Sequence, residues 1–129
     1  MAISLQAKQQ QEGAHELLQQ AIDIREKETL PIYRRELGGH HPFTATILDS
    51  LSVNYHDLGD LDSAKRYAEE ALQIRQEVLE DHIDTAKSLY DLAMVYKSMK
   101  EFTEAKKHLE KCEAMQKKLL EDYNDDLER

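Results

Sequence analysis

The chain has 129 residues and a net charge of −9, from 17 basic and 26 acidic residues. Proteins gain affinity for nucleic acids and for anionic membranes by neutralising phosphates, so this charge argues against both as partners. Four glycines and two prolines are too few for the turns of a sheet fold. A share of 33% charged residues suits amphipathic helices with one solvated face, so the composition predicts one all-α domain over residues 1–129.

Cysteine usage and the N-terminal sequence bear on the cellular compartment. Cys112 is the single cysteine and cannot form an intrachain disulfide. The segment MAISLQAKQQQEG lacks a basic start followed by an apolar run, and no apolar run approaches the ~20 residues of a membrane helix. We therefore expect a cytoplasmic protein with no membrane insertion.

The first predicted element, residues 1–37, is similar to the second half of a later unit. Its segment EGAHELLQQAIDIREKE overlays SAKRYAEEALQIRQEV at an offset of 50 residues, which brings Arg25 onto Arg75. Alanines and isoleucines match at helical spacing in the same overlay. We therefore expect residues 1–37 to be half of a repeat.

Pro31 is the irregular point of this element, because it has no amide hydrogen and disfavours helical geometry at the residue before it. Either the helix ends near residues 28–29 and restarts at Pro31, or one kinked helix runs to about Leu37. We favour the kinked helix because good helix formers lie on both sides of the proline. Gly38 and Gly39 would then end it.

The next two predicted elements, residues 41–79 and 82–120, align with each other without a gap. Their shared apolar residues keep helical spacing, as Leu48 and Leu51 do at i and i+3. A short breaker divides each window into two helices, which must then run antiparallel. With the half repeat, the two hairpins predict about five helices, followed by an acidic tail at 121–129.

The breaker of the first window reads LGDLD. Gly59 is able to supply a left-handed helix end, and Asp60 or Asp62 is able to cap the next helix. Alanines recur where helices should meet, and Cys112 stands in the second window where Ala71 stands in the first. We therefore expect Cys112 to be a small buried contact residue rather than a reactive thiol.

The pattern GG-HHP-x-TAT-x-L-x-x-L-x-x-x-Y-x-x-LGD-x-x-x-A-x-x-Y-x-x-x-AL-x-IR resembles tetratricopeptide repeats of the kinesin light chain type, also found in nephrocystin-3-like proteins. The resemblance covers about residues 12–120. It implies a right-handed superhelix of antiparallel helix pairs, whose first helices line a concave groove that binds peptides. The expected function is therefore that of a protein–protein interaction scaffold, as a segment of a larger multidomain protein.

The resemblance also indicates which residues face the groove. In kinesin light chain repeats, the first helix often carries two adjacent asparagines, of which the second commonly holds the backbone of a bound peptide. Here Asp49-Ser50 and Tyr90-Asp91 take their places, and neither pair keeps an asparagine. The expected ligand surface is a mildly acidic concave face, with these residues: Asp49, Asn54, Lys87, Tyr90 and Asp91.

Catalytic and metal-binding patterns are missing from the sequence. With four glycines no phosphate-binding loop is well formed, and no nucleophile motif is present. His40 and His41 are adjacent, so they point in different directions on a helix, and no third ligand has suitable spacing. We expect no enzymatic activity, no cofactor and no metal.

The alternative function is assembly. The segment KKHLEKCEAMQKKLLEDY is amphipathic and would be able to pair with its copy in a second chain. Leu109, Met115 and Leu119, together with Cys112 and Leu120, would form the seam of this homodimer.

Overall fold

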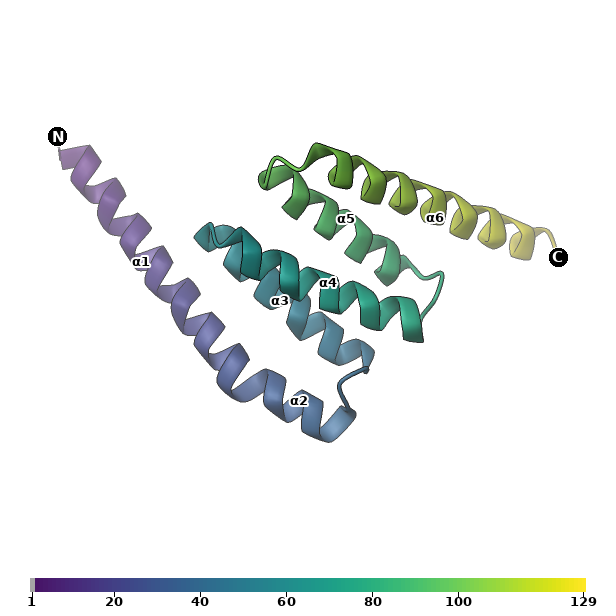
Figure 1. The fold of residues 1–129 in the computed structure, drawn as a ribbon, viewed down its shortest axis with the longest axis horizontal. Coiled ribbons are helices and arrows are strands. Elements are labelled where there is room, and N and C mark those ends of the chain that lie inside the picture. Colours follow the sequence, from purple (N-terminus) through teal and green to yellow (C-terminus); the bar gives the residue numbers. More distant parts are fainter. Residues whose placement is uncertain (1) are drawn as a thin grey trace.

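The computed structural model describes the backbone of residues 2–129 and the side chains of residues 4–129, and every element in this range is helical. Figure 1 shows the helices as a stack of neighbouring rods, with the N-terminal rod diverging from the others. The elements are α1 (Ala2–Ile24), η1 (Arg25–Thr29), α2 (Leu30–Leu37), α3 (Pro42–Leu58), α4 (Leu61–Val78), α5 (Ile83–Ser98) and α6 (Phe102–Glu128). The predicted all-α solenoid is confirmed. Its five helices over residues 2–129 are the continuous α1–η1–α2 rod and α3 to α6. Among the helices of residues 2–129, none combines the length and the apolar character of a membrane span.

The first rod stays helical through Pro31, so the structure has the continuous helix rather than the break. A π-helical turn, η1, ends at Thr29, two residues before the proline, and the amide of Leu30 donates to the carbonyl of Arg25. In a regular α-helix the ring of Pro31 would crowd the carbonyl of Lys27, and the wider turn relieves this. Gly38, with φ of 89°, follows the end of the rod at Leu37.

Two histidines at equivalent repeat positions begin the first helices of the hairpins. His41 Nδ1 accepts from the amide of Phe43 at 3.1 Å, ahead of α3, where Pro42 occupies the first turn. His82 Nδ1 accepts from the amide of Asp84 at 3.0 Å, ahead of α5. The His-Pro opening is therefore a helix cap, which satisfies an amide that the helix itself leaves unpaired.

The turn between α3 and α4 follows the sequence expectation. Gly59 has φ of 86° and ends α3 in the left-handed region. Of the two candidate caps, Asp60 is used, and its carboxylate accepts from the amide of Ser63 at 3.2 Å. The short turn makes α3 and α4 an antiparallel hairpin (Figure 1).

Two buried apolar clusters form the core, and α4 contributes different residues to each. The first joins the N-terminal rod, α3 and α4, and its buried members are Ile22, Leu30, Ala45, Leu48, Leu51, Tyr67, Ala71 and Ile74. The second joins α4, α5 and α6, with the buried residues Ala68, Leu72, Ala86, Leu89, Leu92, Tyr96, Ala105 and Cys112. As expected, Cys112 is buried, and burial raises the pKa of its thiol.

Candidate functional site

An open pocket of about 450 Å³ lies where α3, α4 and α5 meet beside the π turn. We call it the α3–α5 pocket. The π turn contributes one lining residue, α3 contributes five, α4 one and α5 two: Arg25, then Thr46, Asp49, Ser50, Val53 and Asn54, then Arg75, then Asp84 and Lys87. The pocket is therefore assembled from elements that are far apart in the sequence.

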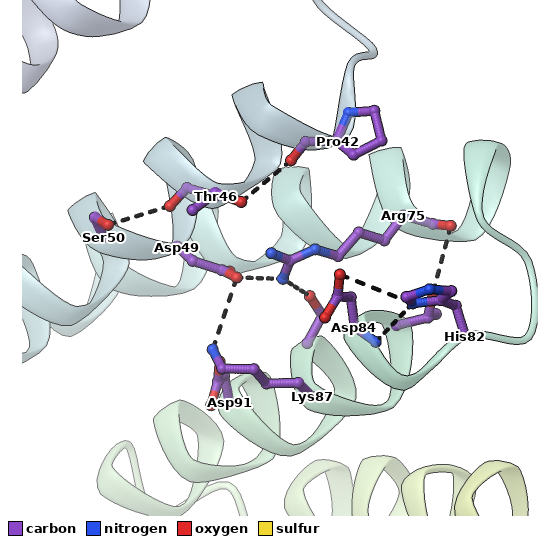
Figure 2. Close-up of polar contacts among 11 residues, drawn as sticks. Pro42, Thr46, Asp49, Ser50, Arg75, His82, Asp84, Lys87 and Asp91 are labelled. Carbon is purple, nitrogen blue, oxygen red and sulfur yellow. Dashed lines mark hydrogen bonds and ion pairs between the residues drawn. The ribbon is translucent and has the colours of Figure 1, made fainter. Parts of the chain in front are cut away.

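Arg75 is the centre of the polar network at this pocket. It is only 5% exposed, and its guanidinium pairs with the carboxylate of Asp49. The same Nη1 donates to Ser88 Oγ at 2.6 Å, so one side chain of α4 ties α3 to α5 (Figure 2). Its backbone carbonyl accepts from Thr85 Oγ1 at 3.4 Å. Both contacts of the guanidinium are made by Nη1, and the buried Nε has no hydrogen-bond partner within residues 4–129.

A second cation approaches the same carboxylate. Lys87 Nζ lies 4.0 Å from Asp49 Oδ2, and it also pairs with Asp91 at 2.9 Å (Figure 2). Burial raises the pKa of the Asp49 carboxyl, and the charges of Arg75 and Lys87 oppose this rise. The site is therefore a cluster of alternating charges across three helices.

The π turn directs two consecutive residues toward the first hairpin. Arg25 Nη1 donates to Asn54 Oδ1 at 2.6 Å at the edge of the pocket. Glu26 accepts from the hydroxyls of Tyr55 and Tyr67, the latter at 3.1 Å, and the two rings stack with centroids 5.7 Å apart. Burial, with the nearby carboxylate, raises the pKa of both tyrosines. The turn thus anchors the N-terminal rod beside the pocket.

A smaller apolar notch of about 120 Å³ adjoins the α3–α5 pocket. Val53 lines both hollows and is 54% exposed, so it forms the ridge between them. The other lining residues of the notch are Ser52, His56, Asp91, Met94 and Val95. A polar hollow and an apolar hollow therefore follow one another along α3 and α5.

The structure brings together three of the five predicted ligand residues, Asp49, Asn54 and Lys87. Asp91 borders them through its ion pair with Lys87 and lines the notch, whereas the half-exposed Tyr90 lines neither hollow.

The pocket also contains two cations that were not among the predicted ligand residues, Arg25 and Arg75. Three cations and two carboxylates line it, so it does not have the mildly acidic character expected of this face. The match of Arg25 with Arg75 in the repeat overlay was the signal that could have identified both.

The expected seam on α6 is partly used within the molecule. Cys112 is buried in the core between α4, α5 and α6, and Met115 packs against the same core. Leu109 and Leu119 are half-buried. These residues therefore do not form the free stripe that a paired helix needs. The exposed apolar residues of α6 are Phe102, Leu120, Tyr123 and Leu127.

Comparisons with known proteins agree with this architecture. A family model described as tetratricopeptide repeat matches residues 27–77 and 55–118, and a second with the same description matches residues 1–28. No curated protein matches the chain. The crystal structure of BtubC (BKLC) from P. vanneervenii, a kinesin light chain-like protein, is similar, with a TM-score of 0.65 and 25% identity. The match covers 70% of this chain and 37% of BtubC. The chain belongs to the tetratricopeptide repeat family and has the kinesin light chain-like form of the fold.

Proposed function

We propose that the chain is a scaffold that holds an extended peptide segment of a partner protein along α3 and α5. Tetratricopeptide repeats mediate protein–protein interactions. The observation that carries the finer proposal is the succession of the polar α3–α5 pocket and the apolar notch, with Val53 between them. An extended segment bonds through its polar main chain and places side chains in pockets, so it is able to contact a polar hollow and an apolar hollow in turn. The proposed location is the cytoplasm, and the proposed role requires no catalysis and no cofactor.

The exposed Val53 provides the test, because both hollows share it. Peptides selected from a random display library on the wild-type chain should bind the Val53→Arg variant at least about tenfold more weakly, as calorimetry would measure. Val78→Arg is the matched control, since Val78 is also an exposed helical valine, 47% accessible, and lies outside both hollows. Equal affinity of the selected peptides for Val53→Arg and the wild type would place their binding elsewhere.

Self-association is the second candidate, and the exposed end of α6 favours it. An open hollow of about 520 Å³ there is lined by Ile83, Leu119, Leu120 and Tyr123, among others, and two of these are exposed leucine and tyrosine side chains of α6. Mass measured in solution at several concentrations would show a dimer that Leu120→Asp with Tyr123→Asp dissociates. A constant monomer mass of the wild type would remove this candidate.

A further inference from the structure

The carboxylate of Asp49 holds the position between two cations. Arg75 from α4 pairs with its Oδ2, and Lys87 from α5 lies 4.0 Å from the same oxygen. Asp49 is 8% exposed and Arg75 is 5% exposed, so the pair is largely withdrawn from water and held by the packing of α3 against α4. Ser88 Oγ fixes the guanidinium from the side of α5. The cations of the inner wall are thus already matched by a carboxylate of the chain itself (Figure 2).

A ligand carboxylate in this pocket would need the place that Asp49 occupies. It would also meet the carboxylate of Asp84 at the rim, where the side chain is half exposed. A ligand ammonium would meet Arg25, Arg75 and Lys87 instead. Like charges in a partly desolvated hollow repel strongly, so Asp49 and Asp84 disfavour a ligand carboxylate beside Arg75, and the three cations disfavour a ligand ammonium. Arg25, whose partner is the neutral Asn54, lies at the edge of the pocket.

Two groups of α3 remain able to bond to a ligand: the second oxygen of the paired Asp49 carboxylate and the neutral side-chain amide of Asn54. The hydrogen bonds found within residues 4–129 use Oδ2 of Asp49 and Oδ1 of Asn54, which leaves Oδ1 of Asp49 as an acceptor and the amide of Asn54 as a donor. Both residues lie on α3 and line the same hollow. A peptide main chain carries one donor and one acceptor per residue, so it complements this pair without adding charge.

We propose that Asp49 is the specificity-determining residue of the α3–α5 pocket: it excludes acidic ligands and selects an uncharged peptide segment held through its main chain. Replacement of Asp49 by asparagine then converts the pocket into an anion site, because Arg75 loses its internal counter-charge and Lys87 keeps only its pair with Asp91. This inference rests on the α3–α5 pocket being the peptide site of the proposed function.

The test compares two variants with the same change of net charge, Asp49→Asn and Asp84→Asn. Both residues line the pocket, but only Asp49 pairs with Arg75. The probe is a fluorescent octaglutamate peptide, with octaglutamine as the uncharged reference, and the measurement is fluorescence anisotropy at low salt. Asp49→Asn should bind octaglutamate at least about tenfold more tightly than the wild type and Asp84→Asn do. Equal gains for the two variants, or no gain for Asp49→Asn, would overturn the proposal.

Asp49→Asn leaves Arg75 buried without a full counter-charge, so its fold is checked by circular dichroism. Should this variant not fold, the double variant Asp49→Asn with Arg75→Gln, which removes both buried charges, takes its place. It should bind octaglutamate no more tightly than the wild type does, and tighter binding would contradict the role of Arg75. Library peptides that proved acidic yet were lost on Val53→Arg would overturn this inference and leave the proposed function standing.

Discussion

The two hairpins share one sequence pattern and differ in how they are held. The α3–α4 turn has Gly59 in the left-handed region and the carboxylate cap of Asp60. The α5–α6 turn has Lys100 at φ of 64°, and Glu101 makes no side-chain cap. Helix α4 contributes to both buried clusters, whereas α6 contributes only to the second and its last turns are exposed. The comparison shows that a repeat draws its stability from its neighbours as much as from its own sequence.

The largest expected difference between the hairpins concerns Arg75 and Gln116, which occupy equivalent positions. Arg75→Ala leaves the buried Asp49 carboxylate with only the more distant Lys87, so it should lower the free energy of unfolding by about 3 kcal/mol. Gln116 is exposed, and Gln116→Ala should change the free energy by less than about 0.5 kcal/mol. Urea unfolding followed by circular dichroism measures both. Similar effects of the two substitutions would mean that the ion pair adds nothing to the first hairpin.

Substitutions in the two turns should have intermediate effects on the free energy of unfolding, and the two effects should be opposite in sign. Gly59→Ala places a side chain at a positive φ and should cost about 1 kcal/mol. Lys100 also has a positive φ, which glycine adopts without strain, so Lys100→Gly should stabilise the chain by about 0.5–1 kcal/mol. Thermal unfolding of the two variants measures the comparison. A destabilised Lys100→Gly variant would show that this lysine has a compensating role at the turn.

The smallest expected effect at neutral pH concerns the tyrosines around Glu26. Burial raises the pKa values of Tyr55 and Tyr67, and so does the carboxylate that their hydroxyls contact. The resulting stabilisation is complete below about pH 10, the pKa of unfolded tyrosine, and is lost as the pH rises through the folded values. The double variant Tyr55→Phe with Tyr67→Phe should therefore lose less stability than the wild type between about pH 8 and about pH 11.

Urea unfolding at both pH values measures this difference, and Tyr96→Phe is the control. Tyr96 stands in the second window where Tyr55 stands in the first, and burial with Glu69 nearby raises its pKa. It has no second tyrosine on the same carboxylate, so its effect should be smaller. An unchanged pH dependence in the double variant would show that the pKa values of these tyrosines are the same in the folded and the unfolded chain.

The local features of the fold could be predicted from the sequence because each depends on few neighbouring residues. Helical spacing of Leu48 and Leu51, the glycine at position 59 and the single buried thiol are of this kind. The π turn could not be predicted, since it reflects how Pro31 is accommodated while α1 and α2 both contact α3. Local propensity allowed either a break or a kink there.

The site was predictable only in part, for a related reason. Asp49, Asn54 and Lys87 lie on first helices of the repeats, where the resemblance already points to a groove. Arg75 lies on a second helix, and its partner Asp49 is 26 residues away in the sequence. Whether a buried arginine meets a carboxylate depends on the packing of two helices, which no local pattern states. For that reason the lining of the pocket carries more positive charge than the sequence predicted.

The π turn has one more consequence, for the geometry of a repeat array. It inserts one residue into the rod, and one residue corresponds to about 100° of rotation around a helix axis. The face that α1 presents is thereby turned relative to the face that α2 presents to α3. Insertion or deletion of a single residue within 25–29 would change this rotation by about 100°. The π turn therefore sets which face of α1 is available to a preceding repeat.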